Sequence, residues 1–175
     1  MALSLRLRRL LTGEYASYRI VPAGLLSRAR DIAAAAGVPA ARFAKAVVVH
    51  DPGDGYLMFV IPSDKRLDLE AVAEAWGRTS LRLASEDELA RLFPDCELGA
   101  MPPFGALYGL PTLVDPCFRE QRTFVFQGGS HDELVEMLYA DYESLARAGV
   151  AGSCLHANAR GPARRPPART ARAAA

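Results

Sequence analysis

The residues best suited to chemistry lie in a segment rich in proline and glycine, from Asp95 to Gly105. Its adjacent prolines, Pro102 and Pro103, fix φ and remove two backbone donors. Gly99 and Gly105 permit positive φ or the close approach of a ligand. The spacing predicts a stiff surface loop that can present backbone N–H groups to a bound carbonyl or phosphate. The donors in question are those of Ala100, Met101 and Gly105.

A lysine, Lys45, stands at the start of the apolar run 46–49. If this run is a β-strand, side chains alternate between faces, and Lys45 shares a face with Val47 and Val49. A lysine on such a face either extends its ammonium group to the rim or holds an anion in a pocket. The residues alone leave both readings open. The choice depends on whether Lys45 and the Asp95–Gly105 loop meet in space.

Several kinds of chemistry find no support in the sequence. No Ser-His-Asp or Cys-His arrangement is recognisable. The three cysteines, Cys96, Cys117 and Cys154, are widely separated, which argues against a disulfide framework and suits a reducing compartment. No Cys or His pair has the spacing of zinc ligands, and we treat the proximity of Cys154 and His156 as coincidence. We therefore expect a cytoplasmic protein without a metal or cofactor.

The composition is that of a soluble globular protein, with 50% hydrophobic and 23% charged residues. No apolar run approaches the ~18 residues needed to cross a bilayer, so we expect no membrane association. Residues 1–12 carry a charge of +3 and residues 151–175 carry +5. Because the total is +1, residues 13–150 carry −7. The basic ends either contact nucleic-acid phosphates or serve solubility.

Hydrophobic periodicity and turn signals predict the order of elements. The strongest local signal is a β-hairpin, with strands Lys45–His50 and Gly55–Ile61 joined by residues 51–54. A capping box at Ser85 to Glu88 opens a helix that ends before Pro94. Further helices are expected at Leu3–Leu11, Ser27–Ala36, Asp68–Trp76 and His131–Arg147, and further strands at Tyr15–Val21, Thr79–Leu83, Pro111–Val114 and Thr123–Gln127.

Along the chain, some predicted strands form a hairpin and others are separated by helices. This order indicates an α+β fold with a mixed, mostly antiparallel twisted sheet flanked by helices. We expect an N-terminal helix in residues 1–14 and a single domain in residues 15–148. Residues 149–175 are rich in Arg, Ala and Pro, so we predict a disordered tail.

The motifs resemble those of the YbaK-type aminoacyl-tRNA deacylases, which include relatives of the editing insertion of bacterial prolyl-tRNA synthetases. The likeness covers roughly residues 15–147. It is carried by Gly-Val-Pro at 37–39, Ala-Lys-Ala-Val-Val-Val at 44–49, Tyr-Leu-Met-Phe-Val-Ile-Pro at 56–62, the Leu83–Leu89 run, Phe93–Glu97, Gly99, Pro102–Gly105 and Gly128–His131. One departure is Val21-Pro22-Ala23-Gly24, where many relatives carry a histidine beside the proline.

The resemblance implies a set of functional residues. The lysine of the family falls on Lys45, and its Gly-x-x-x-Pro loop falls on Gly99 to Pro103. The catalytic residues expected on this basis are Lys45, Gly99, Ala100, Met101, Pro103 and Gly105. The substrate-binding residues expected are Phe59, Ile61, Ser63, Phe104, Gly128 and His131, with Met101 also considered for the apolar wall of the pocket.

The implied activity is hydrolysis of mischarged aminoacyl-tRNA in trans, without a cofactor. Such enzymes are thought to need no side-chain nucleophile, because the ribose hydroxyl beside the ester assists. A second hypothesis is an inactive module of the same fold that binds aminoacyl-tRNA or a synthetase. The amino acid, the tRNA and the oligomeric state do not follow from the sequence.

Overall fold

The computed structural model describes residues 3–22, 29–150 and 156–158. The strands are β1 (Tyr18–Pro22), β2 (Phe43–Asp51), β3 (Gly55–Pro62), β4 (Lys65–Leu67), β5 (Arg82–Leu83), β6 (Thr112–Val114), β7 (Thr123–Gln127), β8 (Glu133–Leu138), β9 (Gly149–Val150) and β10 (His156–Asn158). The helices are α1 (Leu5–Gly13), α2 (Ala29–Ala35), α3 (Leu69–Ala75), α4 (Glu86–Leu92) and α5 (Tyr139–Ala146), with 3-10 helices η1 (Gly105–Tyr108) and η2 (Pro116–Glu120).

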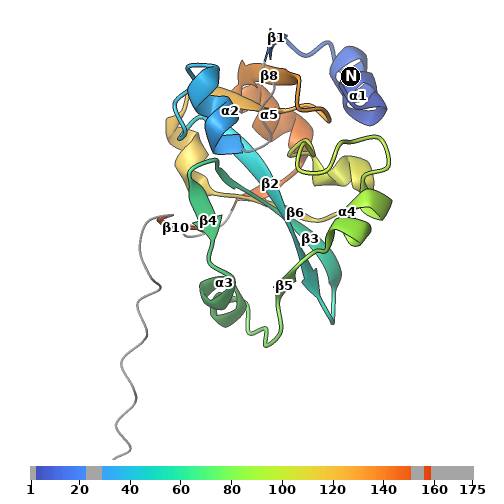
Figure 1. Ribbon diagram of the computed structural model, residues 1–175, viewed down its shortest axis with the longest axis vertical. Helices are drawn as coiled ribbons and strands as arrows, with labels where there is room; N and C mark the ends of the chain where they lie inside the picture. Colours follow the sequence, from blue (N-terminus) through green and yellow to red (C-terminus); the bar gives the residue numbers. More distant parts are fainter. Residues whose placement is uncertain (1–2, 23–28, 151–155, 159–175) are drawn as a thin grey trace, which may run out of the picture.

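One large mixed sheet organises these elements (Figure 1). Its main path is β1-β8-β7-β2-β3-β6-β9, and β5 pairs with β2. The β2–β7, β3–β6 and β6–β9 pairs are parallel, and the other pairs are antiparallel. A second, two-stranded sheet joins β4 and β10. The predicted α+β fold with a mixed, mostly antiparallel sheet is confirmed.

The β2–β3 hairpin is the longest pairing in the sheet. It runs in antiparallel register from Ala44 opposite Pro62 to Asp51 opposite Gly55. The chain turns between the strands through exposed residues, where the Asp51 carboxylate accepts a 2.8 Å hydrogen bond from the Gly53 N–H. Gly55 has a φ of 82°, which glycine adopts without a steric penalty. The predicted hairpin is therefore confirmed.

Helices cover both faces of the sheet. The main core lies on one face, where buried leucines of α1 pack with aromatic side chains of β7 and α5. The opposite face holds two smaller clusters. In one, Ile32 of α2 packs with Phe43 and Val125. In the other, Val72 of α3 packs with Phe59 and Ile61 of β3. We call this second side the α2–α3 face.

Trp76 follows α3 and packs against the sheet on the α2–α3 face. Its ring lies 5.4 Å from that of Phe59, centroid to centroid. Asp68 caps the N-terminus of α3 by accepting a hydrogen bond from the Ala71 N–H. The aromatic contact and the cap together hold α3 over the end of β3.

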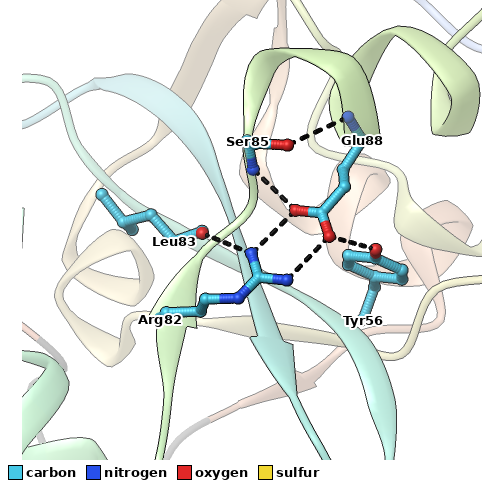
Figure 2. A network of polar contacts seen from close by, with 5 residues as sticks. All are labelled: Tyr56, Arg82, Leu83, Ser85 and Glu88. Atoms are coloured by element: carbon cyan, nitrogen blue, oxygen red, sulfur yellow. Dashed lines mark hydrogen bonds and ion pairs between the residues drawn. The ribbon is translucent and has the colours of Figure 1, made fainter.

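A polar network holds α4 against the hairpin (Figure 2). The Glu88 carboxylate accepts hydrogen bonds from both Arg82 Nη atoms, from the Ser85 N–H and from the Tyr56 hydroxyl, at 2.7–2.8 Å. The Ser85 hydroxyl accepts from the Glu88 N–H, which completes the predicted capping box. These donors, Arg82 first, hold the pKa of Glu88 well below its usual range. The network fixes the helix that leads into the Asp95–Gly105 loop.

The helix predicted over His131–Arg147 is wrong in its first half. Residues 133–138 form β8, which pairs with β7 on one side and with β1 on the other. Leu134 packs on the α2–α3 face, whereas Val135 and Met137 pack into the main core, so the side chains alternate with a period of two. Backbone pairing on both edges outweighs the helical spacing of the leucines.

Two short strands lie beyond residue 148, where the predicted domain ends. Gly149–Val150 pairs with β6, and His156–Asn158 pairs with β4. The rest of the predicted tail and the Ala23–Gly24 departure lie outside the described residues. At the other end, Leu7 and Leu11 of α1 are buried in the main core, so α1 is packed as part of the domain. Among helices of the described residues, none has the length and hydropathy to cross a bilayer.

Gly105 is expected to be essential for packing. A Cβ atom at this position would lie 2.1 Å from the Thr112 hydroxyl and 2.8 Å from the Leu110 carbonyl oxygen. We expect Gly105→Ala to lower the free energy of unfolding by about 2 kcal/mol, because overpacking forces β6 or η1 to move. Urea denaturation measures the change.

Gly13→Ala is the matched control for this experiment. Gly13 ends α1, and apart from its chain neighbours and the backbone of its own helix, no described atom lies within 4 Å of the position that a Cβ atom would occupy there. The control should leave stability unchanged or slightly raised. Equal stability of Gly105→Ala and wild type would show that the loop adapts to the added methyl group.

Candidate functional site

The site begins where β2 and β7 separate. These strands form two parallel pairs, Phe43 with Val125 and Ala44 with Phe126. Lys45 and Gln127 are the next residues of each strand. By strand alternation they share the face of Phe43 and Val125, which is the α2–α3 face. Neighbouring strands lie about 4.8 Å apart, so the two polar side chains start from adjacent positions.

The Lys45 ammonium group is held in place by backbone carbonyls. Its Nζ donates a 3.1 Å hydrogen bond to the Ser63 oxygen and a second hydrogen bond to the Lys65 oxygen. An ammonium group has three donors, so one N–H has no partner among the described residues. Burial lowers the pKa of Lys45; Asp64 opposes this shift and Arg66 adds to it. The lysine is therefore a positioned cation rather than a solvated rim residue.

Buried oxygen atoms without partners among the described residues belong to the turn whose Ser63 carbonyl binds Lys45. The Ser63 hydroxyl and one Asp64 carboxylate oxygen, Oδ1, have no hydrogen bond within the part of the chain that the structure describes. Ser63 is 4% exposed and lies in the turn after β3, where its N–H donates to the Phe43 oxygen at 2.8 Å. Unsatisfied buried polar groups are rare in folded proteins. Their position next to a fixed ammonium indicates a site prepared for a polar ligand.

His131 is fixed by three hydrogen bonds. Its Nδ1 lies 2.9 Å from the Gln127 amide nitrogen, and its Nε2 lies 2.9 Å from the Leu98 carbonyl oxygen. With the amide nitrogen as donor to Nδ1, the ring is neutral and carries its proton on Nε2. The His131 N–H donates to the Glu97 carboxylate at 2.9 Å. The sequence predicted a helix that starts at His131; instead, Glu97 and His131 join the loop to the β7–β8 turn.

Gly99 lies against the His131 ring. Its φ is 85°, and a Cβ atom at this position would be 3.6 Å from His131 Cε1. The Glu97 N–H donates to the Gly129 oxygen at 2.8 Å, which fixes the same approach. The structure thus brings together Gly99, His131 and Gln127, with Lys45 on the strand beside Gln127.

The rest of the loop turns away into the main core. Met101 and Phe104 are 7% and 1% exposed and belong to the main core. The Pro103 carbonyl accepts a hydrogen bond from the Tyr142 hydroxyl. The Ala100 N–H, a predicted ligand donor, donates to the Glu97 oxygen at 3.0 Å. The close packing of Gly105 on Thr112 accounts for this glycine without a ligand.

The remaining predicted residues divide between the two faces. Phe59 and Ile61 are fully buried on the α2–α3 face, which Lys45 shares. Gly128 faces α1, where a Cβ atom would lie 2.2 Å from a methyl carbon of Leu3. Lys45, Phe59 and Ile61 therefore share one face, and the Ser63 carbonyl binds Lys45. Gly99 and His131 are linked to this face through Gln127. The structure does not bring Ala100, Met101, Pro103, Phe104 and Gly105 to that face.

Within the described residues, no group of three His, Cys, Asp or Glu side chains is arranged to hold a metal ion. The site instead offers an ammonium group, an amide, an imidazole and unpaired oxygens beside an apolar wall. Such a set suits a ligand with both polar and apolar parts.

Comparison with known proteins identifies the class. The chain belongs to the aminoacyl-tRNA editing domain family, whose model matches residues 26–145. The YbaK-type resemblance and the prediction of an aminoacyl-tRNA deacylase are thereby confirmed.

Two curated relatives are similar over different lengths. The multifunctional Ser/Thr-tRNA deacylase ProXp-y of Escherichia coli K12 is 30% identical over 146 residues, covering 81% of this chain and 87% of that protein. A proline–tRNA ligase of Fervidobacterium nodosum is 27% identical over 104 residues, covering 59% of this chain and 18% of the ligase.

Solved structures share the fold. A candidate trans-editing enzyme for prolyl-tRNA synthetase has a TM-score of 0.70 and 25% identity, covering 86% of this chain and 97% of that one. A hypothetical protein has a TM-score of 0.73 at 24% identity, covering 83% of this chain and 97% of its own, and supports the fold alone.

Two residues of the site escaped sequence reasoning. Gln127 carries no local signal, because it is one polar residue at the end of an apolar strand. Glu97 reads as part of a polar loop, and its contact with the His131 N–H joins residues far apart in the chain. The register of β7 against β2 is the information that reveals Gln127.

Glu97→Ala tests the link between the loop and the turn. Removing the carboxylate leaves the His131 N–H without its acceptor, which costs about 1 kcal/mol of stability. Hydrogen–deuterium exchange should show faster exchange at residues 128–131, with the core strands unchanged. Glu120→Ala, at an exposed residue of η2, is the control. Unchanged exchange at His131 would show that another acceptor replaces the carboxylate.

Proposed function

We propose that the protein removes amino acids from mischarged aminoacyl-tRNA in trans, by hydrolysis of the ester at the site of Lys45, Gln127, His131 and Gly99. The observation that carries this proposal is the Lys45 ammonium group. It is held by two carbonyl oxygens, and its third N–H has no partner among the described residues. In the backbone, Lys45 follows the last β2–β7 pair next to Gln127, which contacts His131, and His131 in turn lies against Gly99. Membership of the editing domain family supports the same reaction class.

In the proposed reaction, water attacks the carbonyl carbon of the aminoacyl ester. The bond to the ribose oxygen then breaks, and that oxygen takes up a proton, giving a free amino acid and a free tRNA 3′ end. The neighbouring ribose hydroxyl assists by orienting the water. Lys45 binds the terminal nucleotide or the aminoacyl end and stabilises the negative charge that develops on oxygen. The reaction itself requires no cofactor.

The backbone of the loop supplies the further donors in this proposal. Gly99, at positive φ beside His131, marks the place where the loop reaches the site. The N–H groups of Ala100 and Met101 reach the ester only if the loop shifts, because the Ala100 N–H donates to the Glu97 backbone oxygen and Met101 packs in the main core. His131 positions Leu98 and Gly99 through the Nε2 contact with the Leu98 oxygen.

Selection of the amino acid is assigned to the apolar wall. Phe59 and Ile61 lie on the face that Lys45 shares, whereas Met101 lies in the main core. A synthetase pocket rejects a near-isosteric amino acid by only about a hundredfold, so a second site must remove the errors. The name of the E. coli relative makes serine and threonine the first candidates for the amino acid that is removed. The similar proline–tRNA ligase and the candidate trans-editing enzyme suggest a prolyl-tRNA synthetase as a partner. We place the reaction in the cytoplasm.

A binding module without activity is the second candidate. The engaged Ala100 N–H and the two occupied His131 nitrogens favour it, because these groups are not free for a reacting ester. Such a module would bind aminoacyl-tRNA without releasing the amino acid. Activity and binding are therefore measured on the same samples.

The decisive experiment measures amino acid release from tRNAs charged with Ser, Thr, Ala, Cys or Pro. Wild type should hydrolyse one or two of these, and Lys45→Ala should lower kcat/KM by about 100-fold or more, as for loss of an oxyanion donor. Lys65→Ala is the matched control, because it removes the chain's other lysine side chain and retains the carbonyl that binds Lys45. Binding without release by wild type would select the second candidate.

The lowered pKa of Lys45 gives an independent test. Lys65→Arg leaves Lys45 as the single lysine, so a ¹³C label on lysine Cε reports on it alone. The signal should titrate below 10.5, because burial disfavours the charged form. Between the folded and unfolded pKa values the unfolded state binds more protons, so this group makes stability rise with pH in that window. A midpoint at or above 10.5 would contradict the buried position.

A further inference from the structure

Helix α1 is a basic element on an acidic body. It carries Arg6, Arg8 and Arg9 and no acidic residue, whereas residues 13–150 sum to −7. It also precedes the region that matches the editing domain family, residues 26–145.

The start of α1 is fixed to the turn that carries His131. The Ser4 N–H donates to the Gly128 oxygen at 2.8 Å. A Cβ atom at Gly129 would lie 2.8 Å from the Ser4 backbone nitrogen, and one at Gly128 would overlap Leu3. Only glycine allows this approach. The Gly129 oxygen also accepts a hydrogen bond from the Glu97 N–H. The start of α1 therefore contacts the same glycine turn that leads into His131 of the proposed site.

The apolar side of α1 is buried against the rest of the domain. Leu7 and Leu11 are 0% and 1% exposed in the main core. Arg6 is also engaged, because it donates to the Leu107 oxygen and lies 4.9 Å from the centre of the Tyr108 ring. A membrane-surface helix needs a free apolar face, so the buried leucines argue against a lipid surface as the partner.

Arg8 and Arg9 remain on the solvent side of α1. Both are exposed, and neither forms an ion pair or a side-chain hydrogen bond in the described part of the chain. At a rise of 1.5 Å per residue they lie about 6 and 7.5 Å along the helix axis from Ser4. A stacked strand advances about 3.4 Å per nucleotide. Both charges therefore lie within a few nucleotides of an ester bound beside His131.

We propose that Arg8 and Arg9 bind backbone phosphates of the tRNA acceptor end while its ester occupies the site. The proposal rests on the proposed function and adds the surface that holds the RNA. Charge complementarity favours RNA, since the pair is positive on a negative body. Each arginine that neutralises a phosphate adds to the salt dependence of binding.

The test compares two substrates that carry the same amino acid: full-length charged tRNA and aminoacyl-adenosine, which has no phosphate. Arg8→Glu/Arg9→Glu should lower kcat/KM for the tRNA at least tenfold at low salt. The loss on aminoacyl-adenosine should be at least fivefold smaller. The slope of log(kcat/KM) against log[salt] for the tRNA should decrease in magnitude by about 1–2.

The matched control is Arg119→Glu/Arg122→Glu, which changes the charge equally. These exposed arginines precede β7, at the opposite end of that strand from the Gly128–Gly129 turn. An equal loss of kcat/KM for the tRNA in this control would overturn the proposal, because it would show that net charge and not the position of the arginines matters. Equal losses on both substrates would assign α1 a purely structural role.

Binding of uncharged tRNA, measured by fluorescence anisotropy on the same variants, separates this inference from the proposed function. If wild type hydrolyses neither substrate, the proposed function fails. The arginine surface is then judged by binding alone. Weaker binding in Arg8→Glu/Arg9→Glu than in the control supports it, and equal binding overturns it.

Discussion

The site depends on the short parallel contact between β2 and β7. Two residue pairs join the strands, and β7 then ends while β2 continues along β3 to Asp51. The polar side chains of Lys45 and Gln127 emerge where this contact stops. Beyond it, β7 must turn back as β8, and the turn carries His131. A longer β2–β7 pairing would leave less open space between the two strands for a ligand. Without any pairing, Lys45 and His131 would lie on separate parts of the fold.

The polar groups of the site are held mainly by backbone atoms. Lys45 is bound by carbonyls at the start of β4, and β4 in turn pairs with β10 near the C-terminus. His131 is bound by the Leu98 carbonyl, and the glycine turn before it rests on α1. Backbone atoms cannot change rotamer, so the site is positioned by the fold itself. Both terminal extensions of the matched domain therefore support the elements that carry the site.

Local signals in the sequence predicted local structure well. The β2–β3 hairpin and the Ser85–Glu88 capping box depend on residues a few positions apart, and the structure has both. The failures concern long-range pairing. Residues 133–138 have a helical pattern, yet β1 and β7 recruit them as a strand. For the loop, spacing could not tell that Gly99 faces His131 while Met101 and Phe104 turn into the core. Lys45 was identified as a site residue from the resemblance to a family. Its neighbour Gln127 was identified only from the register of β7 against β2.

The contact between Trp76 and Phe59 gives the protein a built-in optical reporter. Trp76 is the single tryptophan of the chain, and it lies against a side chain of the wall that we assign to the amino acid. Indole emission responds to the polarity and packing of its surroundings. We expect a ligand at this wall to shift Phe59, and the indole ring packs directly against that side chain. Intrinsic fluorescence can thus follow ligand entry in the unmodified chain, with no attached dye and no catalytic turnover.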